Sequence, residues 1–210
     1  VIKDRQYTTP AESRARRSAQ TALYHVAEAL TRWIAPILSF TAEEIWALLP
    51  GKRPESVLFS QWYDGLHALD ADSVFSTTDW DRILEVRTHV ARALEAARNE
   101  QGLGGSLNAE IDLHVGGDTA ALLQRLGDEL RFVLITSDAR VLSGPPPDGA
   151  VPVVLEDSSN LFVVVRKSEH SKCVRCWHRR PDVGSHAGHP ELCGRCVENI
   201  TGPGEERRFA

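Results

Sequence analysis

All four cysteines of this chain lie near its end, in two pairs of the form C-x2-C. The first pair is Cys173 and Cys176, and the second pair, 16 residues further on, is Cys193 and Cys196. Each C-x2-C turn directs two sulfur atoms at one centre, so two turns supply the four soft ligands of a tetrahedral site. Zn²⁺ fits such a site, with Zn–S distances of about 2.3 Å, and four sulfur ligands leave no position open for a reacting water. The spacing therefore predicts one structural zinc ion.

Other uses of the four cysteines stay open at this point. A rubredoxin-like iron site has the same ligands, two disulfides need an oxidising compartment, and a single C-x2-C pair can be a redox pair. Three nearby histidines are possible competing ligands, although four cysteines in register favour surface or supporting positions for them: His178, His186 and His189. Because this segment has few large aliphatic residues, we expect the metal to supply most of its stability.

The same segment is rich in arginine and contains one tryptophan. Guanidinium groups pair with phosphates, and an exposed indole stacks on an unpaired base. The RNA-binding candidates in this segment are Arg175, Trp177, Arg179, Arg180, Arg195, Arg207 and Arg208. Packing of Trp177 over the metal site is the alternative to stacking on a base. A second basic cluster, formed by Arg14, Arg16 and Arg17, is either a solvated helix face or a phosphate contact.

Residues 1–105 show the period of amphipathic helices. Residues 9–12 (TPAE) predict a helix start with a capping threonine, a proline in the first turn and a capping-box glutamate. The apolar side chains that recur in steps of three and four, and so share one face of this helix, are Leu23, Val26, Leu30, Trp33 (or Ile34) and Ile37. Pro36 should interrupt the helix, because proline lacks an amide proton. A second capping box at residues 41–44 (TAEE) predicts a short helix that ends at Pro50.

A third helix is predicted after an irregular connection over residues 51–77. Trp62 and Tyr63 are the apolar residues expected to anchor this connection. The helix follows Thr78 and ends near Gly102, since glycine is favoured just beyond a helix. The buried stripe predicted for it is Ile83, Val86 (or Arg87), Val90, Leu94 and Ala97.

Beyond Gly105 the period changes to 2. Alternating apolar and charged residues over 110–115 predict a half-buried strand. Asp118 is expected to cap a short helix that ends at Leu126, and residues 130–135 suit either a helix or a strand. Further strands are predicted at 139–142, 151–155 and 161–165, with turns at 144–149 and 156–160.

These patterns predict a mainly α-helical bundle followed by a small α+β region and a C-terminal zinc knuckle or ribbon. The predicted divisions are residues 1–105, 106–165 and 166–210. The chain of 210 residues is long enough for this, and its content of 42% hydrophobic and 25% charged residues is ordinary for globular proteins.

Several classes of protein are excluded by the sequence. It has no run of about 18 apolar residues, so no membrane span is predicted, and its start does not resemble a signal peptide. Gly102–Gly105 precedes a strand and lacks a following GK[ST], which excludes a phosphate-binding loop. No spacing indicates a catalytic triad. Since the chain contains no Met, we expect it to be a piece of a longer polypeptide.

Several runs of the sequence resemble a known family. Residues 9–50 (TPAESRARRSAQTALYHVAEALTRWIAPILSFTAEEIWALLP) resemble the helical anticodon-binding domain of class I aminoacyl-tRNA synthetases for branched aliphatic amino acids. Residues 104–115 (GGSLNAEIDLHV) and 126–141 (LGDELRFVLITSDARV), together with the four-cysteine segment that begins KCVRCWHRRPDVG, resemble the C-terminal end of bacterial isoleucyl-tRNA synthetases. The similarity covers nearly the whole chain.

Members of this family activate isoleucine with ATP, esterify it to tRNA and hydrolyse mischarged valine in an editing domain. The HIGH and KMSKS motifs are absent here, so the resemblance implies a catalytically inactive part that binds the anticodon arm of tRNA(Ile). It also implies that the four cysteines bind zinc, that the upstream catalytic and editing domains are partners, and that the parent is a monomeric cytoplasmic ligase. Two rivals are the zinc finger of a DNA-repair glycosylase and a zinc-stabilised protein-interaction module.

Overall fold

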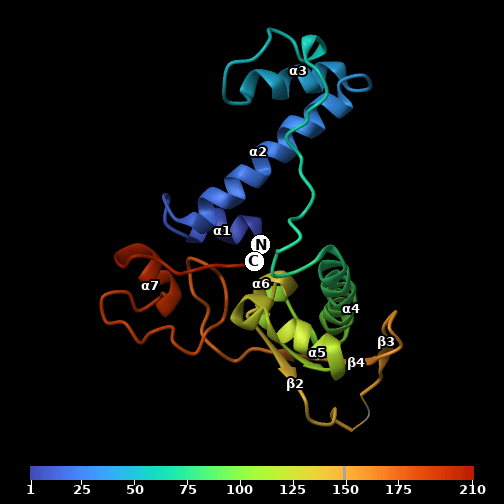
Figure 1. Ribbon diagram of the computed structural model, residues 1–210. Helices are drawn as coiled ribbons and strands as arrows, with labels where there is room; N and C mark the ends of the chain where they lie inside the picture. Colours follow the sequence, from blue (N-terminus) through green and yellow to red (C-terminus); the bar gives the residue numbers. More distant parts are fainter. Residues whose placement is uncertain (149) are drawn as a thin grey trace.

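Figure 1 shows the computed structural model of the chain, which describes residues 1–148 and 150–210. The helices are α1 (Ile2–Thr8), α2 (Arg14–Ile34), α3 (Ser39–Leu48), α4 (Thr77–Gln101), α5 (Gly117–Gln124), α6 (Leu130–Leu134) and α7 (Gly194–Thr201). The strands are β1 (Ala109–His114), β2 (Asp138–Leu142), β3 (Val153–Val154) and β4 (Asn160–Lys167). Helices α2 and α3 form an arm that projects from a body built of α4, α5, α6 and the sheet. The segment that carries α7 lies beside the body, near α1.

The first long helix, α2, starts later than the sequence predicts, and a separate helix α1 precedes it. Ser13 caps α2, since its side-chain oxygen accepts a hydrogen bond from the backbone N–H of Arg16 at 3.2 Å. Thr9 instead follows the end of α1, where its hydroxyl donates to the carbonyl of Arg5 at 2.5 Å. The predicted start at residues 9–12 is therefore wrong, because the threonine bonds back to the preceding helix.

Two other predicted caps are also wrong, although both helices are confirmed. Helix α3 begins at Ser39, and Leu38 at its N-cap makes no side-chain hydrogen bond, so residues 41–44 lie within the helix. Helix α5 begins at Gly117, which places Asp118 inside the first turn. Its negative charge still favours the positive end of the helix dipole there.

The apolar stripe of α2 is largely exposed. Leu30 is 48% exposed, Trp33 49% and, just beyond the helix, Ile37 83%. The buried side of α2 consists of smaller or polar residues: Ala15, Ala19, Glu28, Ala29 and Thr31. The predicted helix and its interruption at Pro36 are confirmed, because α2 ends at Ile34. Among the described residues, none covers the apolar face of the arm.

A small core holds the far end of the arm together. Trp46 is 2% exposed and lies in one cluster with Ala35, Ala42 and Val57. Beside it, the buried carboxylate of Glu28 accepts hydrogen bonds from Arg32 at 2.5 Å and from Arg53 at 3.0 Å. Burial alone would raise the pKa of Glu28, but these two hydrogen bonds outweigh burial and lower it. Both guanidinium groups also lie over the Trp46 ring, 4.7 and 4.5 Å from its centroid.

The connection between α3 and α4 is attached to the arm by one of its two predicted anchors. The hydroxyl of Tyr63 lies 2.6 Å from Nδ1 of His25, on α2. Trp62, the other predicted anchor, is 72% exposed. The tyrosine therefore fixes this connection to α2, and the expectation for the tryptophan is wrong.

Helix α4 has the end and the buried stripe that the sequence predicts, but it begins at Thr77, so Thr78 lies within its first turn. Ser76 and Asp79 form a capping box, with hydrogen bonds of 3.1 and 2.8 Å. Gly102 ends the helix in the left-handed conformation, with φ of 63°. The predicted buried positions are all confirmed: Ile83, Val86, Val90, Leu94 and Ala97. These side chains belong to the same hydrophobic core as β1, α5 and α6.

The sheet has the strand order β2-β1-β4-β3, so β1 and β4 are its central strands. Strand β1 pairs in parallel with β2 and antiparallel with β4. The parallel pair is connected by α5 and α6, as a crossover between parallel strands requires. Asp112 on β1 is 1% exposed because Arg140 and Arg166 pair with it. The expectation of a half-buried strand is therefore wrong, since these ion pairs cover its polar face.

The architecture thus combines seven α-helices, a small four-stranded sheet and a C-terminal cluster of four cysteines within the described residues. Residues 130–134 are helical, which decides between the two predicted states. The predicted turn at 144–149 is irregular as far as residue 148, and residue 149 lies outside the described residues. In the described part of the chain, no helix combines the length and apolarity needed to cross a membrane.

We expect Leu113→Ala to lower the free energy of unfolding by about 3 kcal/mol, because a fully buried leucine leaves a cavity when truncated. Urea unfolding followed by circular dichroism measures this. Leu48→Ala is the matched control, since Leu48 is 86% exposed and its truncation should change stability little. Equal effects of the two substitutions would contradict a core centred on β1.

Candidate metal centre and nucleic-acid interface

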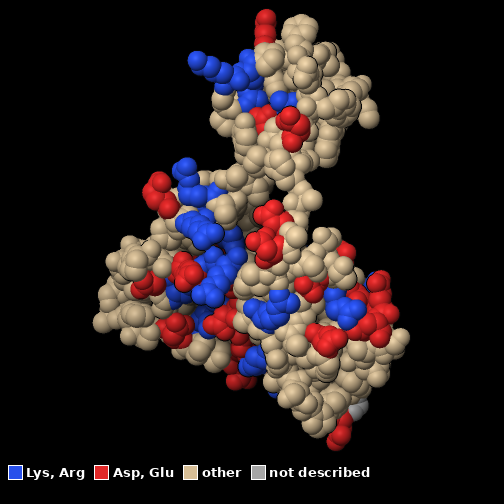
Figure 2. Space-filling model, in the orientation of Figure 1, with Lys and Arg blue, Asp and Glu red and all other residues tan. Residues whose placement is uncertain are grey.

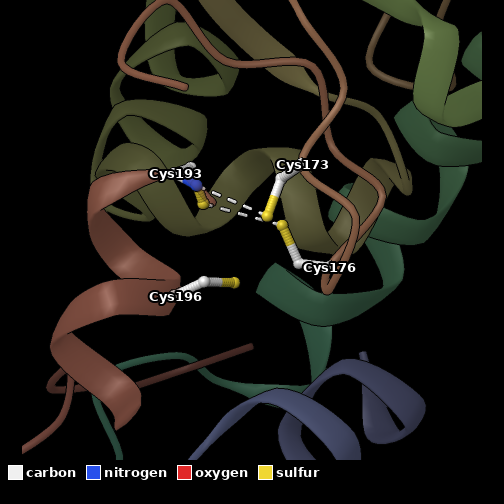
Figure 3. A group of neighbouring side chains, drawn as sticks. All are labelled: Cys173, Cys176, Cys193 and Cys196. Carbon is white, nitrogen blue, oxygen red and sulfur yellow. Dashed lines mark hydrogen bonds between the residues drawn. The ribbon is translucent and has the colours of Figure 1, made fainter. Parts of the chain in front are cut away.

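The four cysteine side chains meet at one buried point (Figure 3). Their sulfur atoms all lie within 4.8 Å of one another, and the sulfurs of Cys176 and Cys193 are 3.7 Å apart. Zn–S bonds of about 2.3 Å arranged as a tetrahedron place sulfur atoms roughly 3.8 Å apart. Val183 and Leu192 pack against the cluster and shield it from water. The predicted ligands are thus brought together in a closed geometry that suits zinc.

Two different backbone structures present the sulfur atoms. Cys173 and Cys176 lie in a tight turn, in which the N–H of Trp177 donates to the carbonyl of Cys173 at 2.9 Å. Cys193 is the N-cap of α7, and Cys196 lies in the first turn of that helix. A helix N-terminus stabilises negative charge, so it favours the thiolate forms that a metal requires.

The donor set fits a divalent soft metal. The neighbouring sulfurs of Cys193 and Cys196 hold the pKa of Cys176 far below the ordinary thiol value. The same interaction with Cys176 raises the pKa of Cys193 to about 12. Zn²⁺ binds thiolates, so its binding to this group would release the thiol protons. All four residues are free cysteines, and each is buried.

The nearby histidines do not join the four-sulfur group within the described residues. His178 is 3% exposed, and its ring meets the edge of Phe132 with centroids 5.5 Å apart. Burial lowers the pKa of His178 to about 4, so the ring is neutral at physiological pH. Its ring packs as an apolar side chain between the body and the metal-bearing segment, which comprises residues 168–210.

Buried ion pairs join the metal-bearing segment to the first helix. Arg195, which lies between Cys193 and Cys196, donates to both carboxylate oxygens of Asp4 at 2.8 and 2.9 Å. Arg207 donates to the same carboxylate at 2.9 Å. Burial alone would raise the pKa of Asp4, but the hydrogen bonds from the two arginines lower it to about 2. The carboxylate is therefore charged at neutral pH and holds α1 against α7.

Three more arginines of this segment bind to backbone or amide oxygens of the body and of α1. Arg175 donates to the carbonyl of Thr8 at 2.6 Å. Arg179 donates to the side-chain oxygen of Asn108 at 2.9 Å. Arg180 donates, at 3.3 Å, to the carbonyl of the residue that precedes β2. These arginines attach the metal-bearing segment to α1 on one side and to the body on the other.

Helix α6 and the turn before it are the parts of the body that contact the metal-bearing segment and the end of the chain. Three guanidinium groups lie near the Phe132 ring, those of Arg131, Arg195 and Arg207, at 4.4, 4.9 and 3.4 Å from its centroid. The carboxylate of Glu129 accepts hydrogen bonds from the backbone N–H groups of the last three residues. The end of the chain is thereby fixed to the body.

Two parts of the chain match known protein families. Residues 1–113 match the anticodon-binding domain of tRNA ligases. The chain belongs to this family. Residues 171–199 match a zinc finger found in FPG and IleRS, and this match includes all four cysteines. The match to a zinc-finger family and the buried four-sulfur geometry together identify the site as a structural zinc site with four cysteine ligands.

Curated relatives of this anticodon-binding chain carry the name isoleucine–tRNA ligase. The chain is 58% identical over 211 residues to the protein of Halorhodospira halophila and 58% identical over 211 residues to that of Thioalkalivibrio sulfidiphilus. It is 55% identical over 210 residues to the protein of Stutzerimonas stutzeri. Each match covers 100% of this chain and 22% of the relative. The chain thus spans about a fifth of the length of the curated relatives it matches.

The predicted RNA-binding residues fall into two groups in the structure. Arg14, Arg17, Trp177 and Arg208 are exposed, and Arg16 is half-buried. The remaining five are committed to the internal contacts described above: Arg175, Arg179, Arg180, Arg195 and Arg207. Figure 2 shows Lys and Arg side chains gathered in a band at the junction of the metal-bearing segment, the base of the arm and the body.

Sequence reasoning missed the acidic partners of these arginines. Asp4 lies in a short helix that has no recognisable periodic pattern, and Glu129 lies in a turn before α6. Both contacts join residues that are far apart along the chain, such as Asp4 and Arg195. No local signal in a single sequence marks such a pair.

We expect the zinc-loaded chain to contain one zinc ion, and its removal by a chelator to unfold the C-terminal segment. Cys176→Ser should abolish tight zinc binding, because a serine hydroxyl is a poor substitute for a thiolate ligand. Metal content and hydrogen exchange across residues 168–210 measure both effects. His189→Ala is the control and should retain the metal. A chain that keeps its full exchange protection after zinc removal would contradict a stabilising role of the metal.

We expect Asp4→Asn to lower the free energy of unfolding by about 3 kcal/mol at neutral pH, because two buried guanidinium groups lose their charged partner. The folded-state pKa of Asp4, about 2, is below the ordinary aspartate value of 3.8. Its contribution is therefore present above about pH 4 and is lost as the pH falls towards 2. Urea unfolding of both proteins across this range should show their difference shrinking in acid.

The control for this pH dependence is Glu12→Gln. Glu12 is 88% exposed and lies 3.8 Å from Arg17, a pair that solvent screens. Its substitution should leave the unfolding free energy nearly unchanged at every pH. A difference between wild type and Asp4→Asn that stays constant from pH 5 to about pH 2 would contradict the assigned pKa.

Proposed function

We propose that this chain is the tRNA-binding part of an isoleucine–tRNA ligase. In this proposal it holds the anticodon arm of tRNA(Ile), while the rest of the enzyme charges that tRNA with isoleucine at the expense of ATP. The observation that supports the proposal most directly is that one chain contains both a match to an anticodon-binding family and a four-sulfur centre. Asp4, in the first of these parts, forms an ion pair with Arg195, in the second. The matches to isoleucine–tRNA ligases along the whole of this chain support the choice of amino acid.

The chain's own residues bind and position RNA in this proposal, and they perform no covalent chemistry. The zinc ion, when bound, supplies a structural cross-link between the turn at Cys173 and the start of α7. The sequence lacks the HIGH and KMSKS motifs through which enzymes of this class bind ATP. We therefore propose that the isolated chain does not form an aminoacyl-adenylate, and that the synthetic and editing reactions occur elsewhere in the complete enzyme.

The proposed phosphate contacts are the exposed or half-buried arginines of α2 and of the chain end. Arg14, Arg16 and Arg17 lie in the first turns of α2, at the base of the arm, and Arg208 lies near the end of the chain. Guanidinium groups bind phosphate oxygens through paired hydrogen bonds. The five inward-turned arginines act on RNA only indirectly in this proposal, because they hold the metal-bearing segment in place.

The exposed apolar face of α2 is the proposed contact with the rest of the synthetase. A stripe that includes Leu30 and Trp33 is unusual on the surface of an isolated protein. Helices from the remainder of the polypeptide would bury it and complete the predicted helical bundle. We also propose that the complete enzyme is a monomer in the cytoplasm. The divisions near residues 105 and 165 stay predictions that limited proteolysis can test.

We expect the zinc-loaded chain to bind tRNA(Ile) about tenfold more tightly than the same tRNA with an exchanged anticodon, a difference of about 1.4 kcal/mol. The reason is that unstacked anticodon bases present edges and faces that a protein can read. Fluorescence anisotropy at one fixed salt concentration measures both affinities. Equal affinities would contradict anticodon reading by this chain.

Two controls separate the rival functions. Arg14→Gln combined with Arg17→Gln should weaken binding to both tRNAs equally and lower its salt dependence, since phosphate contacts carry no sequence information. A duplex DNA of equal length should bind more weakly than either tRNA. A preference for the duplex would support a repair-type zinc finger, and no binding to any nucleic acid would support a protein-interaction module.

A further inference from the structure

A cavity of about 320 Å³ lies between the body and the metal-bearing segment. The turn before α6 and the start of that helix form its wall on the body side, which includes Arg131 and Phe132. Residues of the metal-bearing segment form the opposite wall. Ligand sites in proteins have volumes of about 300–1,000 Å³, so this space is large enough for a small ligand. The basic band in Figure 2 runs along the same junction.

Four arginines line this cavity: Arg131, Arg180, Arg195 and Arg207. Arg195 and Arg207 both form ion pairs with Asp4. Arg180 donates to the carbonyl of the residue before β2 and lies 3.7 Å from a carboxylate oxygen of the first residue of that strand. Arg131 differs from these three, because none of the described carboxylates forms an ion pair with it.

Arg131 is a buried cation whose charge is not compensated. It is 8% exposed, and its one described hydrogen bond runs from Nε to the carbonyl of Asp128 at 3.1 Å. No described hydrogen bond satisfies its two terminal NH₂ groups. Burial, and after it the charges of Arg180 and Arg195, lower the pKa of Arg131 to about 10, so the group still carries its charge at neutral pH. A buried charge without a partner is costly, and an anion in the cavity would stabilise it.

A second donor along the same cavity also lacks a partner. The Nη2 atom of Arg207 is buried and makes no hydrogen bond to any described residue. The other nitrogen atoms of this guanidinium donate to the carbonyl of Ala210 and to Asp4. Buried polar atoms are nearly always hydrogen-bonded, so an unsatisfied donor beside a cavity indicates a missing acceptor. Two guanidinium groups that lack acceptors thus line one cavity.

Three carboxylates along the cavity already have other partners. Glu129 accepts hydrogen bonds from backbone N–H groups at the end of the chain. Glu205 accepts one from Arg195 at 3.0 Å, and Asp182 accepts one from the N–H of Gly194 at 2.8 Å. An external anion therefore suits the unsatisfied donors better than these side chains do. Guanidinium groups bind phosphate oxygens through paired, charge-assisted hydrogen bonds.

We propose that this cavity binds one phosphate-class oxyanion, which Arg131 holds from the body and Arg207 from the metal-bearing segment. The bound anion is a counter-ion between the two parts and stabilises their docking. Its source is either a free oxyanion or one phosphodiester group of a bound RNA, since both present the same oxygen atoms to the arginines. The inference does not depend on the proposed tRNA binding, because inorganic phosphate itself is the probe.

The test is a calorimetric titration of the zinc-loaded chain with inorganic phosphate, at constant ionic strength and with chloride as the balancing anion. Wild type is compared with Arg131→Met, which keeps a long side chain but removes the charge, and with Arg131→Lys, which keeps the charge but loses the paired donors. Arg87→Met is the matched control. Arg87 also donates to a backbone carbonyl, that of Val133 in α6 at 3.0 Å, but it does not line the cavity. Zinc content is measured after each titration.

We expect wild type to bind one phosphate saturably, and Arg131→Met to bind it about tenfold more weakly or worse, because charge-assisted hydrogen bonds are lost. Arg131→Lys should have an intermediate affinity. Without phosphate, Arg131→Met should melt at the same temperature as wild type or higher, because an uncompensated buried charge is removed. Phosphate should raise the melting temperature of wild type and of Arg87→Met, but not that of Arg131→Met.

Competition with RNA identifies the source of the anion. The RNA probe is a hairpin with the stem and loop of the tRNA(Ile) anticodon arm. If the hairpin displaces phosphate, and Arg131→Met lowers the salt dependence of hairpin binding by about one phosphate contact, the site takes a phosphodiester of the RNA backbone. If phosphate stays bound beside the hairpin, the site takes a free oxyanion.

Other outcomes would overturn the inference. Absence of saturable phosphate binding by the zinc-loaded wild type would show that the negative charge of the zinc–thiolate centre suffices for these arginines. Unchanged phosphate affinity in Arg131→Met, or an equal loss in Arg87→Met, would show that the anion does not bind in this cavity. A chain that binds phosphate as expected but does not bind the hairpin would contradict the proposed tRNA binding and leave the anion site established.

Discussion

The position of the metal-bearing segment depends on one buried carboxylate, that of Asp4. It accepts hydrogen bonds from Arg195 and Arg207 in a region where little water reaches. Because Arg195 lies between two zinc ligands at the start of α7, the geometry that gathers the sulfur atoms also directs its guanidinium towards α1. Metal binding and docking of the segment are thus coupled through a single residue. An uncharged partner would leave two buried cations without compensation.

This coupling changes how the many arginines of the segment should be understood. Five of them bind oxygen atoms of the protein itself, so an arginine-rich composition here mainly reflects internal attachment. The positive charge left for RNA is correspondingly small, which agrees with a formal net charge of −5 for the whole chain. Affinity for RNA would then depend on a few placed groups more than on a general positive field.

The sequence predicts local features well and long-range features poorly. The ligands Cys173 to Cys196 and the buried stripe of α4 follow from spacing alone, because a metal turn and an amphipathic helix are local structures. The burial of Asp112 and of Asp4 does not follow, since each depends on arginines that are distant along the chain. The exposure of the apolar face of α2 does not follow either, because periodicity identifies an apolar face but does not say what covers it.

The interlocked body and the exposed arm have complementary mechanical roles. In the body, α4, the sheet and the end of the chain share one core, and Glu129 holds the last residues against it. The arm is attached mainly through α1 and through the Tyr63–His25 contact, and its apolar face is open. A partner domain that buried this face would fix the arm without disturbing the metal site, because the two lie on different elements.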